Sequence, residues 1–158
     1  DGIDDHMTAE HVLDRYDIAS FCAWVYSRKP VGGYIIVKPR SPAGHGFVIT
    51  ENEGWSWSAF LNRDDTQPEI KSSSIPVANK LRHVVATTNG KLLSLYIDGD
   101  FRGERVILLQ EVSNSQPLRI GGWPELGDFF NGIIDDVRIY NRALSEAEVK
   151  ALYDFEKP

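Results

Sequence analysis

Cysteine, clustered basic charge and long apolar runs are scarce in this sequence, and each shortage removes a class of protein. Cys22 is the single cysteine among 158 residues, so no internal disulfide is possible. No apolar run approaches the roughly 20 residues that span a bilayer, which argues against membrane insertion. Asp and Glu number 23 against 17 Lys and Arg, and basic residues cluster no further than Arg28-Lys29, so we expect no nucleic-acid partner.

Catalytic motifs are missing as well. The sequence has no Gly-x-Ser-x-Gly elbow, no His-Glu-x-x-His zinc helix and no glycine-rich phosphate loop. Glycosidases need two facing carboxylates, and the nearest candidate, Glu51-Asn52-Glu53, stops at Gly54 in an expected turn. Cys22 lies in the apolar run Phe21–Val25, which is typical of a buried, inert thiol. We therefore expect no catalysis in this domain alone.

What is present describes a single domain rich in strands. A composition of 42% hydrophobic and 25% charged residues is that of a folded globular protein, and 158 residues suit one domain over 1–158. Because the chain begins at Asp1 inside what reads as a pattern, we expect a domain excised from a larger protein.

Short runs rich in Val, Ile, Phe, Tyr and Trp alternate with Gly, Asn, Asp and Pro, which predicts an all-β fold. So many strands with one short helix require two packed sheets. The expected strands are Ile18–Ser27, Tyr34–Pro39, Gly46–Thr50, Gly54–Asn62, Arg82–Thr88, Lys91–Ile97, Phe101–Val106, Leu118–Ile120 and Gly132–Tyr140.

Two tight reversals stand in the middle of the chain. Asn89-Gly90 is the preferred pair for a type I′ turn, because both central residues need a positive φ. Asp98-Gly99 again supplies residues that tolerate a positive φ. Together they predict a three-stranded antiparallel meander.

One helix is expected near the end of the chain. Ser145 and Glu148 have the spacing of a capping box, in which each side chain bonds the other's backbone N–H. Its apolar face against the sheets is expected to consist of Leu144, Val149, Leu152 and Tyr153.

Several segments, in the right order, are similar to one family. The closing run Gly132–Ser145 resembles the last strand and turn of laminin G-like, concanavalin A-like domains. Asp1–Asp5 resembles their "DG-x-DD" opening, and Phe21–Val25 resembles their "SAWV" strand. Leu81–Gly99 is similar to their central meander, with Leu81 in place of the usual Trp, and Leu118–Gly122 matches the strand before the last loop.

The resemblance covers almost the whole chain. It implies a two-sheet antiparallel jelly-roll sandwich with one short C-terminal helix. It says much less about function, because the fold hosts lectins, carbohydrate-binding modules, adhesion domains and enzymes.

Asp135 is the acidic residue of most interest. Ile133, Val137 and Ile139 share its alternation parity and suit a core face, where an unpaired carboxylate is costly to bury. A structural calcium ion would satisfy it, since Ca²⁺ takes about 6–8 oxygen ligands. The resemblance implies Asp1 as a further ligand, because it places the opening segment beside the closing strand. The alternative is that Asp135 accepts hydrogen bonds from turn amides.

Exposed aromatic rings would serve a carbohydrate ligand, because a flat ring stacks on the C–H face of a sugar. Trp123 is the leading candidate, since it lies in a loop with turn residues on both sides. The alternative is a hydrophobic lid over the sandwich edge. Tyr34 follows a Gly-Gly pair and would line a binding rim or serve as an ordinary loop residue.

Trp55 and Trp57 share one parity with Ala59, which favours packing between the sheets. If that face is exposed instead, the two indoles form a long platform for sugars. Asn62 and Asp64 follow this strand and would hydrogen-bond vicinal hydroxyls from the rim, although a solvated turn explains them equally well.

The pattern as a whole favours a non-catalytic carbohydrate-binding module that recognises a glycan. We expect it to be an accessory domain of a larger secreted or cell-surface protein, with other domains of the same parent chain as further partners. Two alternatives stay open: a protein–protein adhesion domain without a sugar site, and a small glycan-cleaving enzyme. A groove at the loop end with an exposed Trp would favour the first reading, and a flat apolar patch would favour adhesion.

Overall fold

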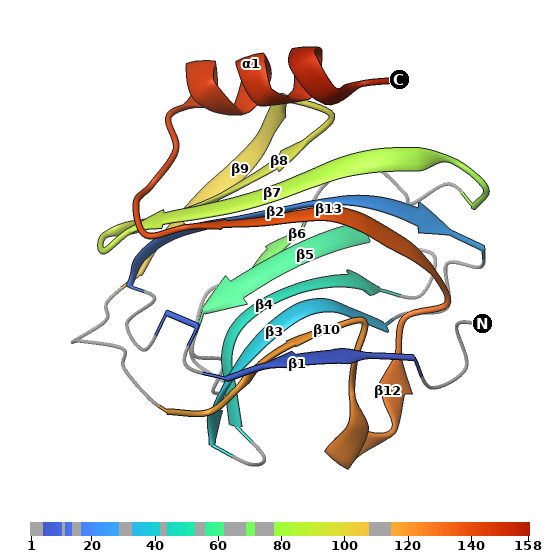
Figure 1. The fold of residues 1–158 in the computed structure, drawn as a ribbon. Helices are drawn as coiled ribbons and strands as arrows, with labels where there is room; N and C mark the ends of the chain where they lie inside the picture. The colour runs from blue at the N-terminus through green and yellow to red at the C-terminus, as the bar shows by residue number, and fades with distance from the viewer. Residues whose placement is uncertain are drawn as a thin grey trace.

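The computed structural model describes residues 5–10, 12–13, 17–28, 33–41, 44–52, 56–61, 69–71, 78–107 and 115–158. The chain forms a two-sheet antiparallel jelly-roll sandwich with one C-terminal helix, as the resemblance implies (Figure 1). In spatial order the first sheet contains β1 (Met7–Ala9), β10 (Leu118–Ile120), β3 (Gly33–Ser41), β4 (Gly44–Asn52), β5 (Ser56–Leu61) and β6 (Glu69–Lys71). The second contains β13 (Gly132–Tyr140), β2 (Ile18–Ser27), β7 (Leu81–Asn89), β8 (Leu92–Ile97) and β9 (Asp100–Val106).

Two small elements cover the outer faces of the sandwich. The helix α1 (Glu146–Glu156) lies across the outer face of the five-stranded sheet (Figure 1). The hairpin of β11 (Gly122–Trp123) and β12 (Asp128–Phe129), joined by the 3₁₀ turn η1 (Pro124–Leu126), lies against the outside of the six-stranded sheet. Among the described residues, no helix is long and apolar enough to cross a membrane.

All nine expected strands are present: three have the expected bounds, four are one or two residues longer at one or both ends, and two, β5 and β8, are shorter. Four strands were not predicted from the sequence, and each has only two or three residues: β1, β6, β11 and β12. Such short strands carry too few positions for alternation to be recognised.

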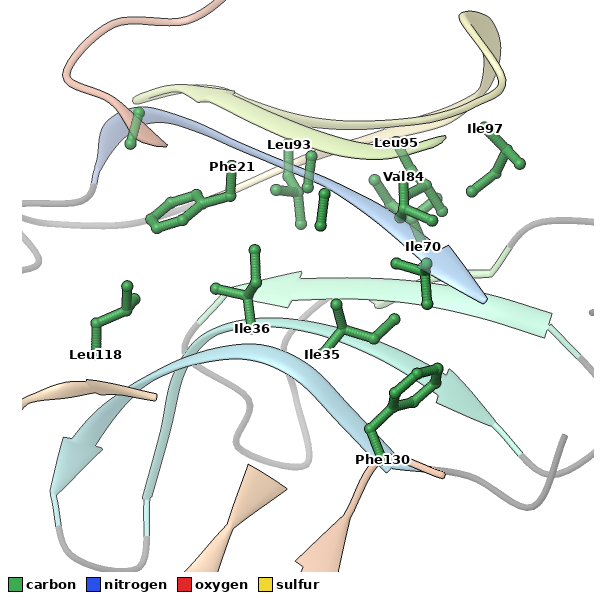
Figure 2. Close-up of a cluster of buried hydrophobic side chains, with 14 of the residues drawn as sticks. Phe21, Ile35, Ile36, Ile70, Val84, Leu93, Leu95, Ile97, Leu118 and Phe130 are labelled. Atoms are coloured by element: carbon green, nitrogen blue, oxygen red, sulfur yellow. The ribbon is translucent and has the colours of Figure 1, made fainter. Parts of the chain in front are cut away.

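The core lies between the sheets. Figure 2 shows Phe21, Leu93 and Leu95 pointing from the five-stranded sheet toward Ile35, Ile36 and Ile70 of the other. Each of these six side chains is at most 2% exposed. Alternate residues of β2, from Ala19 to Val25, face this core, whereas Cys22 and Trp24 between them face α1, so the middle of the strand is buried on both sides.

The predicted meander is confirmed, because β7, β8 and β9 are consecutive antiparallel neighbours. The turn chemistry differs between its two ends. Asp98 and Gly99 both have positive φ, at 55° and 77°, whereas in the first turn Gly90 has a positive φ and Asn89 does not. Instead, the Asn89 side chain accepts hydrogen bonds from the backbone N–H groups of Lys91 and Leu92. The type I′ prediction for Asn89-Gly90 is therefore wrong.

The predicted alternation of β13 is wrong in its first half. The register against β2 shifts between Asp135 and Arg138, and Asp136 has a φ of 46°. This β-bulge changes which residues face the core. Ile134 and Val137 pack on the core, while Ile133 is 50% exposed. Asp135 is likewise exposed, so no buried carboxylate arises.

The predicted helix is confirmed together with its cap. The Ser145 side chain accepts from the Glu148 backbone N–H, and the Glu148 carboxylate accepts from the Ser145 N–H at 2.8 Å. With Arg142, these bonds lower the pKa of Glu148 to about 2. Val149 is fully buried against the sheet. The Ser20 hydroxyl donates to the Arg142 carbonyl oxygen and accepts from the Leu144 N–H, each at 2.8 Å, which anchors the segment before the helix.

Candidate functional site

An open hollow of about 360 Å³ lies at the end of the sandwich where β1 and β13 begin. Sites for small ligands span roughly 300–1,000 Å³, so this volume lies at the lower end of the range. We call it the edge hollow. It is lined by Asp5, His6, Met7, Arg28, Ile120, Gly121, Phe130, Gly132, Ile133 and Ile134.

Two glycines let the chain form these walls. Gly121 has a φ of 87°, and a Cβ there would lie 3.0 Å from the Asp5 carbonyl oxygen. A Cβ on Gly132 would lie 2.1 Å from the Tyr26 carbonyl oxygen, which no side chain tolerates. Both positions need glycine, because the N-terminal segment and β2 pass directly against them.

The edge hollow combines exposed apolar and exposed polar side chains. Met7 is 68% and Ile133 is 50% exposed, so the hollow presents accessible apolar surface. Asp5, His6 and Arg28 are exposed on the same hollow and carry a carboxylate, an imidazole and a guanidinium. The arrangement offers apolar contact and hydrogen bonds to one ligand.

Trp123 does not lie on an exposed rim. Its side chain is 0% exposed, so the expectation of an exposed ring is wrong and the lid alternative describes it better. Pairing of β11 with β12 turns the indole onto the outer face of β3, beside Val37. The structure does bring Trp123 and Tyr34 together, with ring centroids 5.6 Å apart in an edge-on arrangement. Tyr34 is half-buried by this contact.

A charged side chain lies against this tryptophan. The Arg119 guanidinium carbon lies 5.8 Å from the Trp123 ring centroid, and the same guanidinium pairs with Glu125 of η1. These two contacts anchor the hairpin on the sheet. Lys38 of β3 is also buried, and its ammonium donates to the carbonyl oxygen of Gln116, before β10.

The calcium hypothesis assumed that the Asp135 carboxylate is buried, and the structure places it at the surface. One oxygen of this exposed carboxylate accepts from the Asp136 backbone N–H at 2.9 Å, which is the alternative foreseen from the sequence. Within the described residues no group of three or more His, Cys, Asp or Glu side chains could hold a metal ion. Asp1 lies outside the described residues, so its pairing with Asp135 stays a prediction.

The other expected site residues are not placed by the structure. Trp55, Asn62 and Asp64 lie outside the described residues. Trp57 is described only as a backbone position in β5, opposite Glu51 of β4. Whether these tryptophans are core or exposed therefore stays a prediction.

Sequence reasoning missed the edge hollow entirely. Its residues come from the N-terminal segment, the end of β2, the end of β10 and the start of β13. No local motif connects these segments. The one available signal was Arg28, the start of the longest basic cluster, directly after a strand.

A second group of buried polar side chains lies beneath α1. The His83 ring is 1% exposed and lies 5.1 Å from Trp24 and 6.1 Å from Tyr153, measured between centroids. The pKa of His83 is lowered to about 4, mainly by burial, while Asp98 opposes the shift and Arg138 adds to it. Burial also raises the pKa of the Cys22 thiol to about 12, as expected for an inert cysteine.

The Glu156 carboxylate completes this group. It accepts a hydrogen bond from Trp24 Nε1 at 3.1 Å and forms an ion pair with Arg138. His83 Nε2 lies 3.9 Å from it, beyond hydrogen-bond distance. The group fastens α1 to the sheet.

Comparisons with known sequences agree with the fold. A family model described as "Concanavalin A-like lectin/glucanases superfamily" matches residues 1–150. Adhesion G-protein coupled receptor V1 of Danio rerio is 26% identical over 80 residues, which are 46% of this chain and 1% of the receptor. The chain thus spans a very small part of that relative.

Three solved structures have a similar fold. A heptameric SAP-like pentraxin from Limulus polyphemus has a TM-score of 0.72 at 14% identity, over 94% of this chain and 75% of that one. Domain 4 of an extracellular arabinanase from Geobacillus stearothermophilus, solved with arabinotriose, has a TM-score of 0.69 at 17% identity, over 87% and 66%. The binding domain of botulinum neurotoxin DC, solved with SialylT, has a TM-score of 0.68 at 19% identity, over 95% and 39%.

Proposed function

The chain belongs to the concanavalin A-like lectin/glucanases superfamily, and we propose that it is a non-catalytic carbohydrate-binding module whose glycan binds in the edge hollow. Two structural neighbours were solved with carbohydrates, arabinotriose and SialylT. The module is one domain of a larger secreted or cell-surface protein. The extracellular arabinanase and the adhesion receptor among its relatives support this assignment.

One observation carries the proposal: the edge hollow sets exposed apolar side chains beside hydrogen-bonding ones. A sugar ring has apolar C–H faces and a rim of hydroxyl groups, so it needs both kinds of contact. Met7 and Ile133 provide the apolar contact. Asp5 accepts hydrogen bonds from hydroxyls, and Arg28 donates to ring and hydroxyl oxygens.

A glycan array with the purified chain, followed by titration calorimetry on the best ligand, tests the proposal. We expect Arg28→Ala and Ile133→Ala each to weaken binding about tenfold, since each removes one kind of contact. Arg105→Ala is the matched control, because Arg105 is an exposed arginine on β9, the opposite edge strand of the same sheet. Absence of any bound glycan, or equal affinity of all three variants, would overturn the proposal.

A further inference from the structure

The floor of the edge hollow is continuous with the core of the sandwich. Ile120 of β10 and Ile134 of β13 are half-buried and pack against the core between the sheets, and Phe130, just before β13, is 3% exposed. All three side chains line the hollow. Among its described lining residues, those with polar side chains are all exposed instead. A ligand group that reaches the floor therefore meets apolar side chains.

The rim of the hollow combines apolar and charged groups from both sheets. Met7 and Ile133 are exposed and lie on β1 and β13, which are edge strands of different sheets. Asp5 precedes β1, and Arg28 follows β2. A guanidinium has five N–H donors and a carboxylate about four acceptor sites, so each can bond a ligand in addition to its protein neighbours. The rim thus offers a donor and an acceptor above an apolar floor.

This layering favours one class of sugar over another. A plain hexose carries hydroxyl and hydroxymethyl groups, and a hydroxyl pressed against apolar side chains loses its bonds to water without gaining others. A 2-acetamido sugar carries a methyl group beyond an amide, whose C=O accepts and whose N–H donates hydrogen bonds. The Phe130 ring is too covered to stack on a sugar face, so the floor suits a compact aliphatic group.

We infer that the edge hollow selects 2-acetamido sugars, with the acetyl methyl group on the floor formed by Ile120, Phe130 and Ile134. Arg28 donates to the amide carbonyl oxygen, and Asp5 accepts from the amide N–H. The inference rests on the proposed carbohydrate binding and names the class of sugar that binds. An apolar site gains about tenfold in affinity from one well-buried methyl group.

Titration of the wild-type chain with matched sugars, followed by NMR, tests the selection. The methyl β-glycosides of N-acetylglucosamine and N-acetylgalactosamine are expected to bind about tenfold more tightly than those of glucose and galactose. Equal affinity within both pairs overturns this inference and leaves the proposed carbohydrate binding standing. Failure of every glycan to bind overturns both. Tighter binding of methyl α-L-fucoside, which has a methyl group but no amide, would overturn the role of the amide.

Saturation-transfer NMR on the wild-type chain reports which part of the sugar contacts the protein. With the acetamido glycoside that binds more tightly, we expect the acetyl methyl protons to receive the strongest transfer, because they lie deepest in the hollow. Transfer concentrated on the ring protons would overturn the placement of the methyl group. This measurement needs no substitution, so it does not depend on whether a variant folds.

A substitution in the floor locates the selection. Ile134→Thr places a hydroxyl on the floor and is expected to abolish most of the tenfold preference for the acetamido sugar. Ile139→Thr is the matched control, because Ile139 is also half-buried against the core but lies at the other end of β13. Both variants are expected to lower the melting temperature by similar amounts. An unchanged preference in Ile134→Thr, or an equal loss in Ile139→Thr, would overturn the assignment to the floor.

Discussion

The two outer faces of the sandwich bury tryptophan under different covers. Over the six-stranded sheet, the β11–β12 hairpin turns its own Trp123 inward, and the nearby ion pair of Arg119 ends at the exposed carboxylate of Glu125. Over the five-stranded sheet, α1 covers Trp24 of the sheet and encloses two ionisable groups, His83 and Glu156. The hairpin is therefore held on its sheet mainly by apolar burial. The packing of α1 on the other sheet also depends on the protonation state of the ionisable groups that it encloses.

The largest effect is expected beneath the hairpin. Trp123→Ala should lower the free energy of unfolding by about 3–5 kcal/mol, because it leaves a cavity where a fully buried indole packed. Urea denaturation measures the loss. Trp123→Phe keeps most of the apolar volume and is expected to lose much less. A loss below about 1 kcal/mol for the alanine variant would mean that the hairpin does not hold the ring as described.

An intermediate effect is expected beneath the helix, as a function of pH. Folded His83 stays neutral down to about pH 4, whereas the unfolded chain takes up this proton near its ordinary pKa of 6.5. Between these values the unfolded state binds more protons, so stability falls as the pH is lowered from 6.5 toward 4. The contribution of this group amounts to about 3 kcal/mol in total.

Denaturation at several pH values tests this difference between the covers. His83→Gln removes the titrating group and should flatten the pH dependence, whereas Trp123→Phe should leave it as steep as in the wild type. Carboxylates titrate in the lower part of this range as well, so the informative quantity is the difference between wild type and His83→Gln. Equal slopes for the two proteins would contradict the assignment to His83.

The smallest effect is expected at the first turn of the helix. Ser145→Ala removes one half of the capping box and should cost about 1 kcal/mol of stability. Ser145→Asp is the matched variant, since an aspartate also caps a helix and should retain most of the stability. An alanine variant as stable as the wild type would indicate that docking of Val149 alone determines where the helix begins.

Local chemistry made much of the fold predictable. β2 runs over the residues expected, Ile18–Ser27, because every position in it is compatible with a strand. The meander and the capping box likewise depend on residues a few positions apart. The errors arose where one backbone detail altered the alternation: the bulge at Asp135–Arg138 exposed Ile133 and Asp135 and removed the argument for a buried carboxylate.

The candidate site was not predictable in the same way. Trp123 looked like a loop residue, and it is buried because the hairpin packs it on β3, far away in sequence. The edge hollow joins residues near both ends of the chain, from Asp5 to Ile134. No short-range sequence pattern predicts which strand ends will lie side by side in the fold.

The sequence by itself determined the all-β class, the meander, the capped helix and the family resemblance, because these follow from alternation, turn residues and motifs within short stretches. The tertiary structure decided which faces are covered, where β13 changes its alternation and which side chains surround the edge hollow. The physical reason is that burial depends on distant partners. A side chain is buried or exposed according to the element that packs against it, and that element is often far away along the chain.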